Sequence, residues 1–368
     1  MNERKKAYLR LLPVFVLFAV LCIAAWLHKP QDTSLSERRP LAQFPEITVE
    51  NVLEGDFMTD FEDYATDQFP LREPFRKLQS FLQFYLLGQK DVNDIYIAEG
   101  SAAKIEDALN EQWVQNSVAK LEKVFHEHFK DSGSKAYFAM IPDKGWYLAE
   151  KHGYPAMDHE KLLELVKNSA DFAQWIELKD TLDITDYYTT DSHWRQECIG
   201  DTAQTLADAM GVEISQQYTE NVAREDFSGV YAGQSALPLP AEPMIYLTSP
   251  VLEGASLYDY ETNKTSGLYD LEELWGRDPY DLFLSGAAAL QVIENPACET
   301  GRELVLFRDS FGSSMAPLLV PGYSKITLVD LRYLSSDYLS QFVEFGDKDV
   351  LFLYSTTILN TSEMLKVK

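Results

Sequence analysis

The sequence has few cysteines and few basic residues, and each shortage argues against a class of protein. Three cysteines among 368 residues cannot form a disulfide framework, and their spacing matches no zinc or redox motif. Cys22 lies in an apolar N-terminal run, so only Cys198 and Cys298 could form a disulfide, although no pattern requires one. The net charge of −26, from 58 acidic and 32 basic residues, argues against nucleic acid as a partner because phosphates would be repelled.

Phosphate-binding and metal-binding motifs are also missing from the sequence. The glycines of segment 229–233 are too sparse for a phosphate-binding loop, and no group of residues has metal-ligand spacing. We therefore expect no metal and no nucleotide cofactor. The excess of acidic residues fits a well-solvated surface and by itself names no substrate.

The first 28 residues carry the pattern of a membrane signal anchor. An uncharged run at 11–27 follows four basic residues, which are Arg4, Lys5, Lys6 and Arg10. As a helix this run would be about 25 Å long, near the short end for a membrane span. No small-residue cleavage site follows it, so we favour an anchor over the alternative, a cleaved signal sequence. The basic residues before the span predict a single-pass protein of the cell membrane whose main domain is extracytoplasmic.

The remaining chain predicts one α/β domain after a linker. Residues 29–45 contain prolines and charges without a period, which is typical of a linker. The domain is expected at 46–368, with an N-terminal helical extension and an irregular insertion at about 212–300. Apolar strands alternate with helices most clearly near the C-terminus, as at 303–307 and 325–329. This alternation predicts a doubly wound, mostly parallel sheet with helices on both faces.

A carboxylate and an imidazole lie two residues apart in the segment Tyr187–Trp194. Side chains at positions i and i+2 of an extended segment share one face, so Asp191 can bind the ring of His193 and stabilise its protonated form. Of the six histidines, His193 alone has apolar aromatic neighbours in the sequence. The pair predicts the base of a serine enzyme; the alternative is a helix N-cap beside a buried structural histidine.

A second motif ends an apolar strand with a serine. In the segment Leu304–Gly312, a predicted strand ends at Asp309 and Ser310, and a helix follows. The carboxyl ends of parallel strands form the ligand-binding edge of such sheets, and the first N–H groups of a helix can stabilise an oxyanion. Ser310 is therefore a candidate nucleophile. The alternative is an ordinary serine or aspartate N-cap.

Longer segments of the chain resemble one protein family. The chain is similar to the DHHW family, which is related to the alginate O-acetyltransferase-like branch of the SGNH hydrolases, in TTDSHW, DPYDLFLSGAAALQVIENP, LVLFRDSFGSSMAPLL and ITLVDLRYL. The similarity extends over most of the chain through SERRPLAQFP, DFEDYATDQFPLR and MIPDKGWYL. It implies an SGNH-hydrolase-like α/β fold, in which Asp191, His193 and Ser310 match the members of a Ser-His-Asp catalytic triad.

The resemblance also implies a function. The related acetyltransferases transfer or hydrolyse acetyl esters on cell-surface polysaccharide without a metal or nucleotide cofactor. We accordingly expect an extracytoplasmic serine-dependent O-acyl transferase or esterase, with polysaccharide as its substrate and a membrane-bound partner that donates the acyl group. The alternative is a non-catalytic protein that binds or assembles polysaccharide and retains the SGNH fold.

The chain departs from the family pattern at Ala287. Relatives read closer to FLGGN in this segment, so Ala287 stands where an amide could donate a hydrogen bond to an oxyanion. Loss of one such donor costs about 2.7–4 kcal/mol in a working enzyme. Further substrate-binding or oxyanion candidates are Gly312, Arg332, Tyr333 and Asn360.

Overall fold

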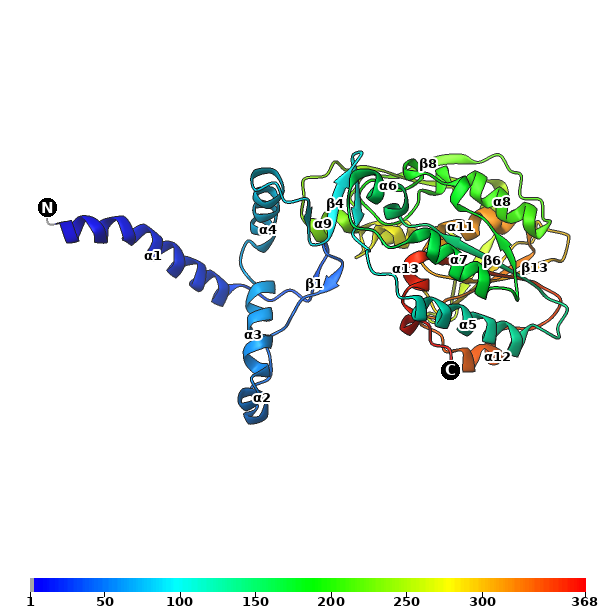
Figure 1. Cartoon of the computed structure of the whole chain (residues 1–368), viewed down its shortest axis with the longest axis horizontal. Coiled ribbons are helices and arrows are strands. Elements are labelled where there is room, and N and C mark those ends of the chain that lie inside the picture. The colour runs from blue at the N-terminus through cyan, green and yellow to red at the C-terminus, as the bar shows by residue number, and fades with distance from the viewer. Residues whose placement is uncertain (1–2) are drawn as a thin grey trace. The chain divides into compact units, whose positions relative to one another are not determined.

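The chain divides into two compact units, which we describe separately. The computed structural model describes residues 3–368 (Figure 1). The N-terminal unit comprises the segment up to Val92 together with Gly233–Pro238, and the α/β unit comprises Asn93–Ala232 and Leu239–Lys368.

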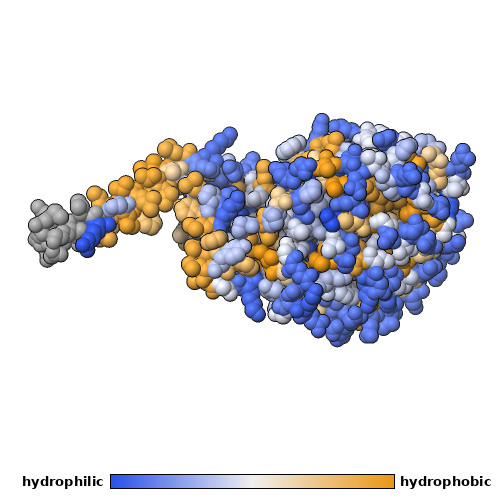
Figure 2. Space-filling view, turned by 90° about the horizontal axis from the view of Figure 1, so that it is seen from above, coloured by the Kyte–Doolittle hydropathy of each residue, from blue (hydrophilic) through white to orange (hydrophobic). Residues whose placement is uncertain are grey.

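The N-terminal unit opens with one long apolar helix. Helix α1 spans Glu3–Leu27, and its segment Arg10–Leu27 is long and apolar enough to cross a membrane (Figure 2). A signal sequence has the same length and composition, so the membrane anchor stays a proposal. The basic residues Arg4, Lys5 and Lys6, on which the expected topology depends, lie outside the side chains that the structure describes.

The rest of the N-terminal unit consists of short strands and helices. They are β1 (Thr33–Ser34), β2 (Arg39–Pro40), α2 (Val49–Glu54), α3 (Asp56–Asp67), α4 (Arg72–Phe81) and β3 (Asp91–Val92). A π-helical turn, Leu82–Leu86, extends α4. The contacts group these helices with the segment before them, whereas the sequence assigned them to the domain that was expected from residue 46 onward.

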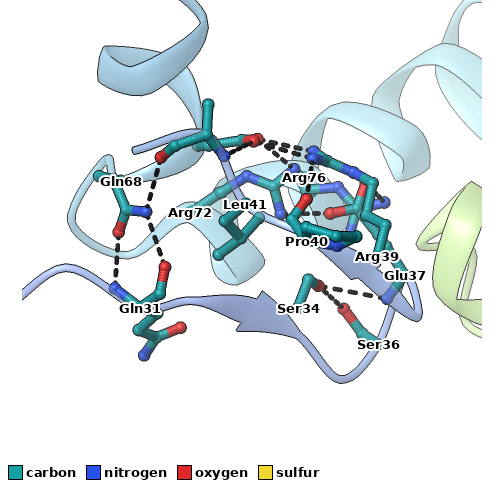
Figure 3. Close-up of polar contacts among 12 residues, drawn as sticks. Gln31, Ser34, Ser36, Glu37, Arg39, Pro40, Leu41, Gln68, Arg72 and Arg76 are labelled. Atoms are coloured by element: carbon teal, nitrogen blue, oxygen red, sulfur yellow. Dashed lines mark hydrogen bonds and ion pairs between the residues drawn. The ribbon is translucent and has the colours of Figure 1, made fainter. Parts of the chain in front are cut away.

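Charged side chains hold the segment that was predicted to be a linker. Strands β1 and β2 pair antiparallel there, and the Arg39 guanidinium donates to both carboxylate oxygens of Asp67 at 2.6 and 2.8 Å (Figure 3). Arg72 and Arg76 form ion pairs with Glu37. The hydrogen bonds from Arg39 lower the pKa of Asp67 to about 2, although burial opposes this shift. The cluster joins residues that are distant in sequence, which the composition of the segment could not reveal.

Within the described part of the chain, an eight-stranded sheet forms the centre of the α/β unit. Its strands are, in spatial order, β11 (Lys264–Ser266), β10 (Ser256–Asp259), β12 (Leu290–Glu294), β14 (Lys325–Val329), β13 (Glu303–Arg308), β15 (Asp349–Ser355), β6 (Lys135–Ile141) and β7 (Gln174–Ile176). The strands from β14 to β7 run parallel, and the strands from β11 to β12 join antiparallel. The mostly parallel sheet that the sequence predicts is therefore confirmed.

Helices cover both faces of this sheet. The helices of the α/β unit are α5 (Glu111–His128), α6 (Lys144–His152), α7 (His159–Ser169), α8 (Gly200–Met210), α10 (Pro250–Gly254), α11 (Phe311–Leu319), α12 (Leu339–Phe342) and α13 (Thr356–Leu359). Successive residues of β13 point to opposite faces: Leu306 packs in the cluster with α8 and α11, and Phe307 in the cluster with α5 and α7. The doubly wound connection of these elements stays a prediction.

The region that was predicted to be an irregular insertion, 212–300, has two parts. The first is a hairpin of β8 (Thr219–Phe227) and β9 (Glu242–Thr248), and α9 (Val230–Ser235) lies between these strands in the chain. The second part supplies β10, β11 and β12 to the edge of the main sheet. The sequence predicted short strands here but not their place in the main sheet, because strand pairing depends on distant partners. A separate hairpin pairs β4 (Ile95–Ala98) with β5 (Ser101–Lys104).

Candidate active site

The residues Asp191, His193 and Ser310 lie in one chain of hydrogen bonds. Nδ1 of His193 is 2.7 Å from Oδ1 of Asp191, and Nε2 of His193 is 2.8 Å from Oγ of Ser310. Asp191 is fully buried, and His193 is 8% exposed. The fold therefore brings together two sequence motifs whose key residues, His193 and Ser310, lie 117 positions apart.

The order of these hydrogen bonds suits activation of a serine. When Nδ1 of His193 donates to the Asp191 carboxylate, Nε2 is left as the acceptor for the Ser310 hydroxyl. The imidazole can then remove the hydroxyl proton, and the carboxylate can stabilise the imidazolium that forms. Such an arrangement can turn the Ser310 oxygen into a nucleophile.

The turn after β13 leaves the Ser310 hydroxyl available to His193. Oδ1 of Asp309 accepts a hydrogen bond from the Phe311 N–H at 3.0 Å, and its Oδ2 accepts one from the Ser355 N–H at 2.8 Å. Asp309 therefore ties the first N–H of α11 and the end of β15 to the turn. Ser310 is the N-cap residue of α11 by position but makes no side-chain capping bond, so its hydroxyl does not serve the helix.

The Asp191–His193 pair is fixed on several sides. Oδ1 of Asp191 also accepts a hydrogen bond from the His193 N–H at 3.1 Å, and Oδ2 accepts one from the Val230 N–H at 2.8 Å. The imidazole stacks on the ring of Tyr280 at 3.9 Å between centroids, and Phe311 lies 4.9 Å from it. These contacts hold the ring in the orientation that directs Nε2 toward Ser310.

Tyr280 is a site residue that the sequence did not single out. It lies in the 3-10 turn Pro279–Leu282, and its hydroxyl is 2.7 Å from Oγ of Ser314 in α11. Burial raises the pKa of Tyr280, so the side chain stays a neutral phenol beside His193. The only signal in the sequence was the segment DPYD, which resembled the family without indicating a role for its tyrosine.

Gly312 packs against Arg308, which precedes the turn that carries Ser310. A Cβ atom at this position would come within 2.6 Å of the Arg308 side chain, so a glycine is needed for this close approach. The Gly312 N–H donates to the Asp309 carbonyl at 3.1 Å. The amide that was a candidate oxyanion donor is thus already bonded within the turn.

The other candidate residues have identifiable partners. Arg332 lies just beyond β14 and forms a bidentate contact with Asp330, with Nη2 to Oδ2 at 2.6 Å, while the Tyr333 side chain is half exposed beside it. Burial lowers the pKa of Arg332, but the hydrogen bonds to Asp330 and the nearby negative charges together raise it above its ordinary value, so its guanidinium stays charged. Both amide atoms of Asn360 bond backbone groups near the start of α5, which suits a structural role.

Known structures share this fold. No protein-family model matches the sequence, and no curated protein matches it. A DHHW family protein from Eubacterium siraeum aligns with a TM-score of 0.60 and 18% identity, over 74% of this chain and 94% of its own. The chain is similar in fold to a DHHW family protein. The resemblance seen in the sequence is therefore confirmed at the level of the fold.

PatB1 from Bacillus cereus is a second structure with this fold. It aligns with a TM-score of 0.57 and 19% identity, over 72% of this chain and 96% of its own. A structure of PatB1 with a sulfonyl adduct aligns with a TM-score of 0.57 and 17% identity, over 74% of this chain and 100% of its own.

The segment that departs from the DHHW pattern has an unusual backbone. Leu284, Ser285 and Gly286 have φ angles of 57°, 54° and 89°, in the left-handed region that disfavours side chains. The fully buried Arg308 donates to Gln291 at 3.2 Å and to Ser313 at 3.0 Å, which connects the strand after this segment to the turn that carries Ser310. Burial lowers the pKa of Arg308.

Ala287 itself is exposed and offers no side-chain donor. Within the described residues, no three histidine, cysteine or acidic side chains lie together as metal ligands would. Cys198 and Cys298 are both free thiols, so the one disulfide that the sequence allowed is not formed.

Proposed function

We propose that the protein is an extracytoplasmic serine-dependent O-acyl transferase or esterase that acts on acetyl esters of cell-surface polysaccharide. The observation that carries this proposal is the continuous contact from Asp191 through His193 to Ser310, with distances of 2.7 and 2.8 Å. A polar side chain at the carboxyl edge of a parallel sheet can also meet a ligand there.

In the first half of the reaction, Ser310 takes the acyl group. His193 Nε2 removes the hydroxyl proton while Ser310 Oγ attacks the carbonyl carbon of the acyl donor. The Asp191 carboxylate stabilises the imidazolium. When the tetrahedral intermediate collapses, the bond from the carbonyl carbon to the donor oxygen breaks, and His193 returns the proton to that oxygen. The products are acyl-Ser310 and the free donor alcohol.

In the second half, the acyl group leaves Ser310. His193 removes a proton from an acceptor hydroxyl, which attacks the acyl carbon, and the proton then passes to Ser310 Oγ as its bond to carbon breaks. A sugar hydroxyl as acceptor gives transfer, and water gives hydrolysis. Arg332 and Tyr333, at the same edge of the sheet, are the candidates for sugar binding, because a half-exposed aromatic ring and a charged guanidinium can contact a sugar.

Polysaccharide as substrate and a membrane-bound acyl donor rest on the family resemblance. The helix α1 supports a location at the membrane, where a partner could deliver an acyl group to the outer side. The sulfonyl adduct of PatB1, a protein of the same fold, supports a sulfonyl reagent as the probe for Ser310.

The test is covalent labelling of the serine. A sulfonyl fluoride forms a bond between its sulfur and Ser310 Oγ, fluoride leaves, and His193 accepts the proton. We expect mass spectrometry to find the adduct on Ser310 in the wild-type chain and none in Ser310→Ala. Ser117→Ala is the matched control, because Ser117 is a fully buried serine of α5 without contact to the triad. Labelling of another serine, or equal labelling of Ser310→Ala, would contradict the proposal.

A second candidate function follows from Ala287. If the oxyanion lacks sufficient donors, the chain binds or assembles polysaccharide without turnover, because the missing amide costs about 2.7–4 kcal/mol of transition-state stabilisation. In that case Ser310→Ala would bind polysaccharide as the wild type does, and neither chain would release acetate from an acetyl ester.

A further inference from the structure

The loop that carries Asp191 has neither helix nor strand to hold it. Residues 188–193 lie between Tyr187 and Trp194, which form an isolated bridge, and the Tyr188 N–H donates to the His193 carbonyl at 3.0 Å. Much of this loop is buried, so its backbone groups need hydrogen-bond partners from elsewhere in the chain. Two charged side chains supply several of those partners.

Lys144 binds the carbonyl groups of the loop. Its Nζ donates to the carbonyl oxygens of Tyr188 at 2.7 Å, Asp191 at 3.1 Å and Thr189 at 3.3 Å. An ammonium group has three N–H donors and no acceptor, so three carbonyl oxygens match its capacity. Lys144 is the first residue of α6 and is 2% exposed, which makes it a buried cation directly behind the catalytic aspartate.

Glu242 binds the opposite set of groups on the same loop. Its Oε2 accepts from the Thr189 N–H at 3.0 Å, and its Oε1 accepts from the Thr190 N–H at 3.0 Å. Oε1 also accepts from the hydroxyls of Thr189 and Thr190 at 2.7 and 3.0 Å. The first residue of β9 thus takes four hydrogen bonds from two consecutive threonines.

The two side chains come from different elements and lie far from the loop in sequence. Lys144 is 44 positions from Tyr188, and Glu242 is 53 positions from Thr189. Burying a charged side chain is expensive compared with burying an apolar one, and an apolar core would stabilise the fold as well. Lys144 is such a buried charge, whereas Glu242 is partly buried. A buried charge fits a loop whose conformation must be fixed more narrowly than apolar packing alone would fix it.

We propose that Lys144 and Glu242 are positioning residues that clamp the Tyr188–Asp191 loop and thereby hold the Asp191–His193 pair in register with Ser310. This inference rests on the proposed function, because the register matters only if Ser310 reacts. Neither side chain touches Ser310, so each acts through the loop and not on the reacting atoms.

The clamp also predicts an electrostatic signature. The groups that face Lys144 are the carboxylates of Asp191 and Glu242 and the ring of Tyr231, whose centroid lies 5.6 Å from Nζ. Burial lowers the pKa of Lys144 to about 7, and the two carboxylates oppose this shift, so the side chain is charged below about pH 7. A positive charge behind Asp191 disfavours protonated His193, and a negative charge favours it.

Two variants test the clamp, and a third variant serves as the matched control. Lys144→Met removes the ammonium group and keeps an unbranched apolar side chain that is one atom shorter. Glu242→Gln removes the negative charge and keeps the shape of the side chain. Lys120→Met is the control, because Lys120 Nζ also donates to two backbone carbonyls, those of Ser362 and Leu365 at 2.8 Å each, outside the loop. All are measured in the full chain on a chromogenic acetyl ester across the pH range.

For Lys144→Met we expect kcat to fall on the order of 10²-fold with KM nearly unchanged, because the loop misplaces the base without altering ester binding. The acidic limb of its pH–rate profile should move to higher pH. In Glu242→Gln the acidic limb should move to lower pH, and kcat should fall roughly tenfold. Lys120→Met should lower only the melting temperature. The clamp would be overturned if the acidic limbs of the two variants move in the same direction, or if Lys144→Met keeps the kcat of the wild type. If Lys144→Met does not fold, the result for Glu242→Gln decides alone.

Amide hydrogen exchange separates failure of the clamp from failure of the proposed function. We expect residues 188–193 to exchange faster in both clamp variants than in the wild type, with the remaining sheet unchanged. The wild-type chain could hydrolyse no ester and bind no sulfonyl group while the clamp variants still exchange faster than it does. That result would contradict the proposed function and leave the clamp as described. Unchanged exchange in both variants overturns the clamp, whatever the activity.

Discussion

The two units of the chain use their large apolar side chains in opposite ways. In the N-terminal unit, Leu53 and Leu86 are 81% and 71% exposed, and charged residues such as Arg39 and Asp67 make the contacts between segments. In the α/β unit, Phe307 and Phe352 are fully buried and stack at 4.9 Å in the centre of the sheet. One unit combines ion pairs and hydrogen bonds with aromatic contacts such as that of Phe44 with Tyr64 at 5.3 Å, and the other has a fully buried apolar core.

This difference explains why the candidate chemistry lies in the α/β unit. A site that must hold hydrogen bonds of 2.7 and 2.8 Å between three side chains needs a rigid frame, which a packed core supplies. The N-terminal unit leaves many of its large apolar side chains exposed, so it lacks the packed core that gives this rigidity. Its exposed apolar side chains follow the long apolar helix α1 in the chain.

The largest expected effect is loss of the reaction on changing the triad. Ser310→Ala and His193→Ala should each lower kcat on the order of 10⁴-fold or more, and the double variant should be little worse, because the three side chains act as one unit. Asp191→Asn should keep the fold and lose a similar factor through the wrong imidazole tautomer. Turnover of a chromogenic acetyl ester measures this, with thermal melting as the control for folding.

The same assay tests whether the α/β unit alone contains the whole site. A chain that begins at Asn93 lacks most of the N-terminal unit, and we expect it to keep the turnover of a small soluble ester within a few-fold of the full chain. If instead it loses as much turnover as Ser310→Ala while staying folded, the α/β unit does not contain the whole site.

The next effect is on stability, and it contrasts the two kinds of apolar residue. Phe352→Ala removes a buried ring from β15 and should lower the free energy of unfolding by about 3–5 kcal/mol. Leu53→Ala removes an exposed side chain of α2 and should change it by less than about 0.5 kcal/mol. Urea titration followed by near-ultraviolet circular dichroism measures both. Similar losses in the two variants would mean that Leu53 is covered in solution.

The candidate triad could be predicted because its signals are local. Asp191 and His193 are two residues apart, and Ser310 follows an apolar strand, so each motif is visible within a short window of sequence. The α/β alternation near the C-terminus is equally local, since each strand there is a continuous apolar run between helices. These features depend on neighbours in the chain, which a single sequence contains.

The supporting residues could not be predicted because their partners are distant. Lys144 reads as a helix-start lysine, Glu242 as a surface acid and Tyr280 as a core aromatic until the fold brings them to the loop and to His193. The same holds for Arg39 and Asp67, because a window of sequence rich in charge and proline looks like a linker whether or not its charges find partners.

Acid should weaken the N-terminal unit. The hydrogen bonds from Arg39 lower the pKa of Asp67 from 3.8 to about 2, so this carboxylate contributes stability above about pH 4, and the contribution is lost as the pH falls toward 2. We expect about 1–2 kcal/mol to be lost in that range, and Asp67→Asn should remove the same amount at neutral pH. Protection factors of residues 31–72, from hydrogen exchange between pH 5 and 2 corrected for the intrinsic rate, measure this loss.

A contrasting variant checks that the acid effect belongs to this pair. Arg39→Met should weaken the pH response of the protection factors of the same residues between pH 4 and 2, because Asp67 would then have lost its main partner. If Arg39→Met responds to acid as the wild type does, another carboxylate governs the stability of the N-terminal unit.

The smallest effect concerns backbone strain, which both units contain. Ser285, with φ of 54°, and Leu71, with φ of 61°, lie in the left-handed region, where a side chain costs about 1–2 kcal/mol relative to glycine. Ser285→Gly also loses an exposed hydrogen bond to Asp270 at 3.3 Å, so we expect the free energy of unfolding to rise by only about 0.5 kcal/mol. Leu71→Gly should raise the free energy of unfolding slightly more, because glycine is tolerated as the N-cap of α4.

Calorimetry measures both changes. Each should raise the midpoint temperature of a different transition if the N-terminal unit and the α/β unit unfold separately. Should both raise one common transition, the units share a single cooperative fold, and the contrast between them lies in composition alone.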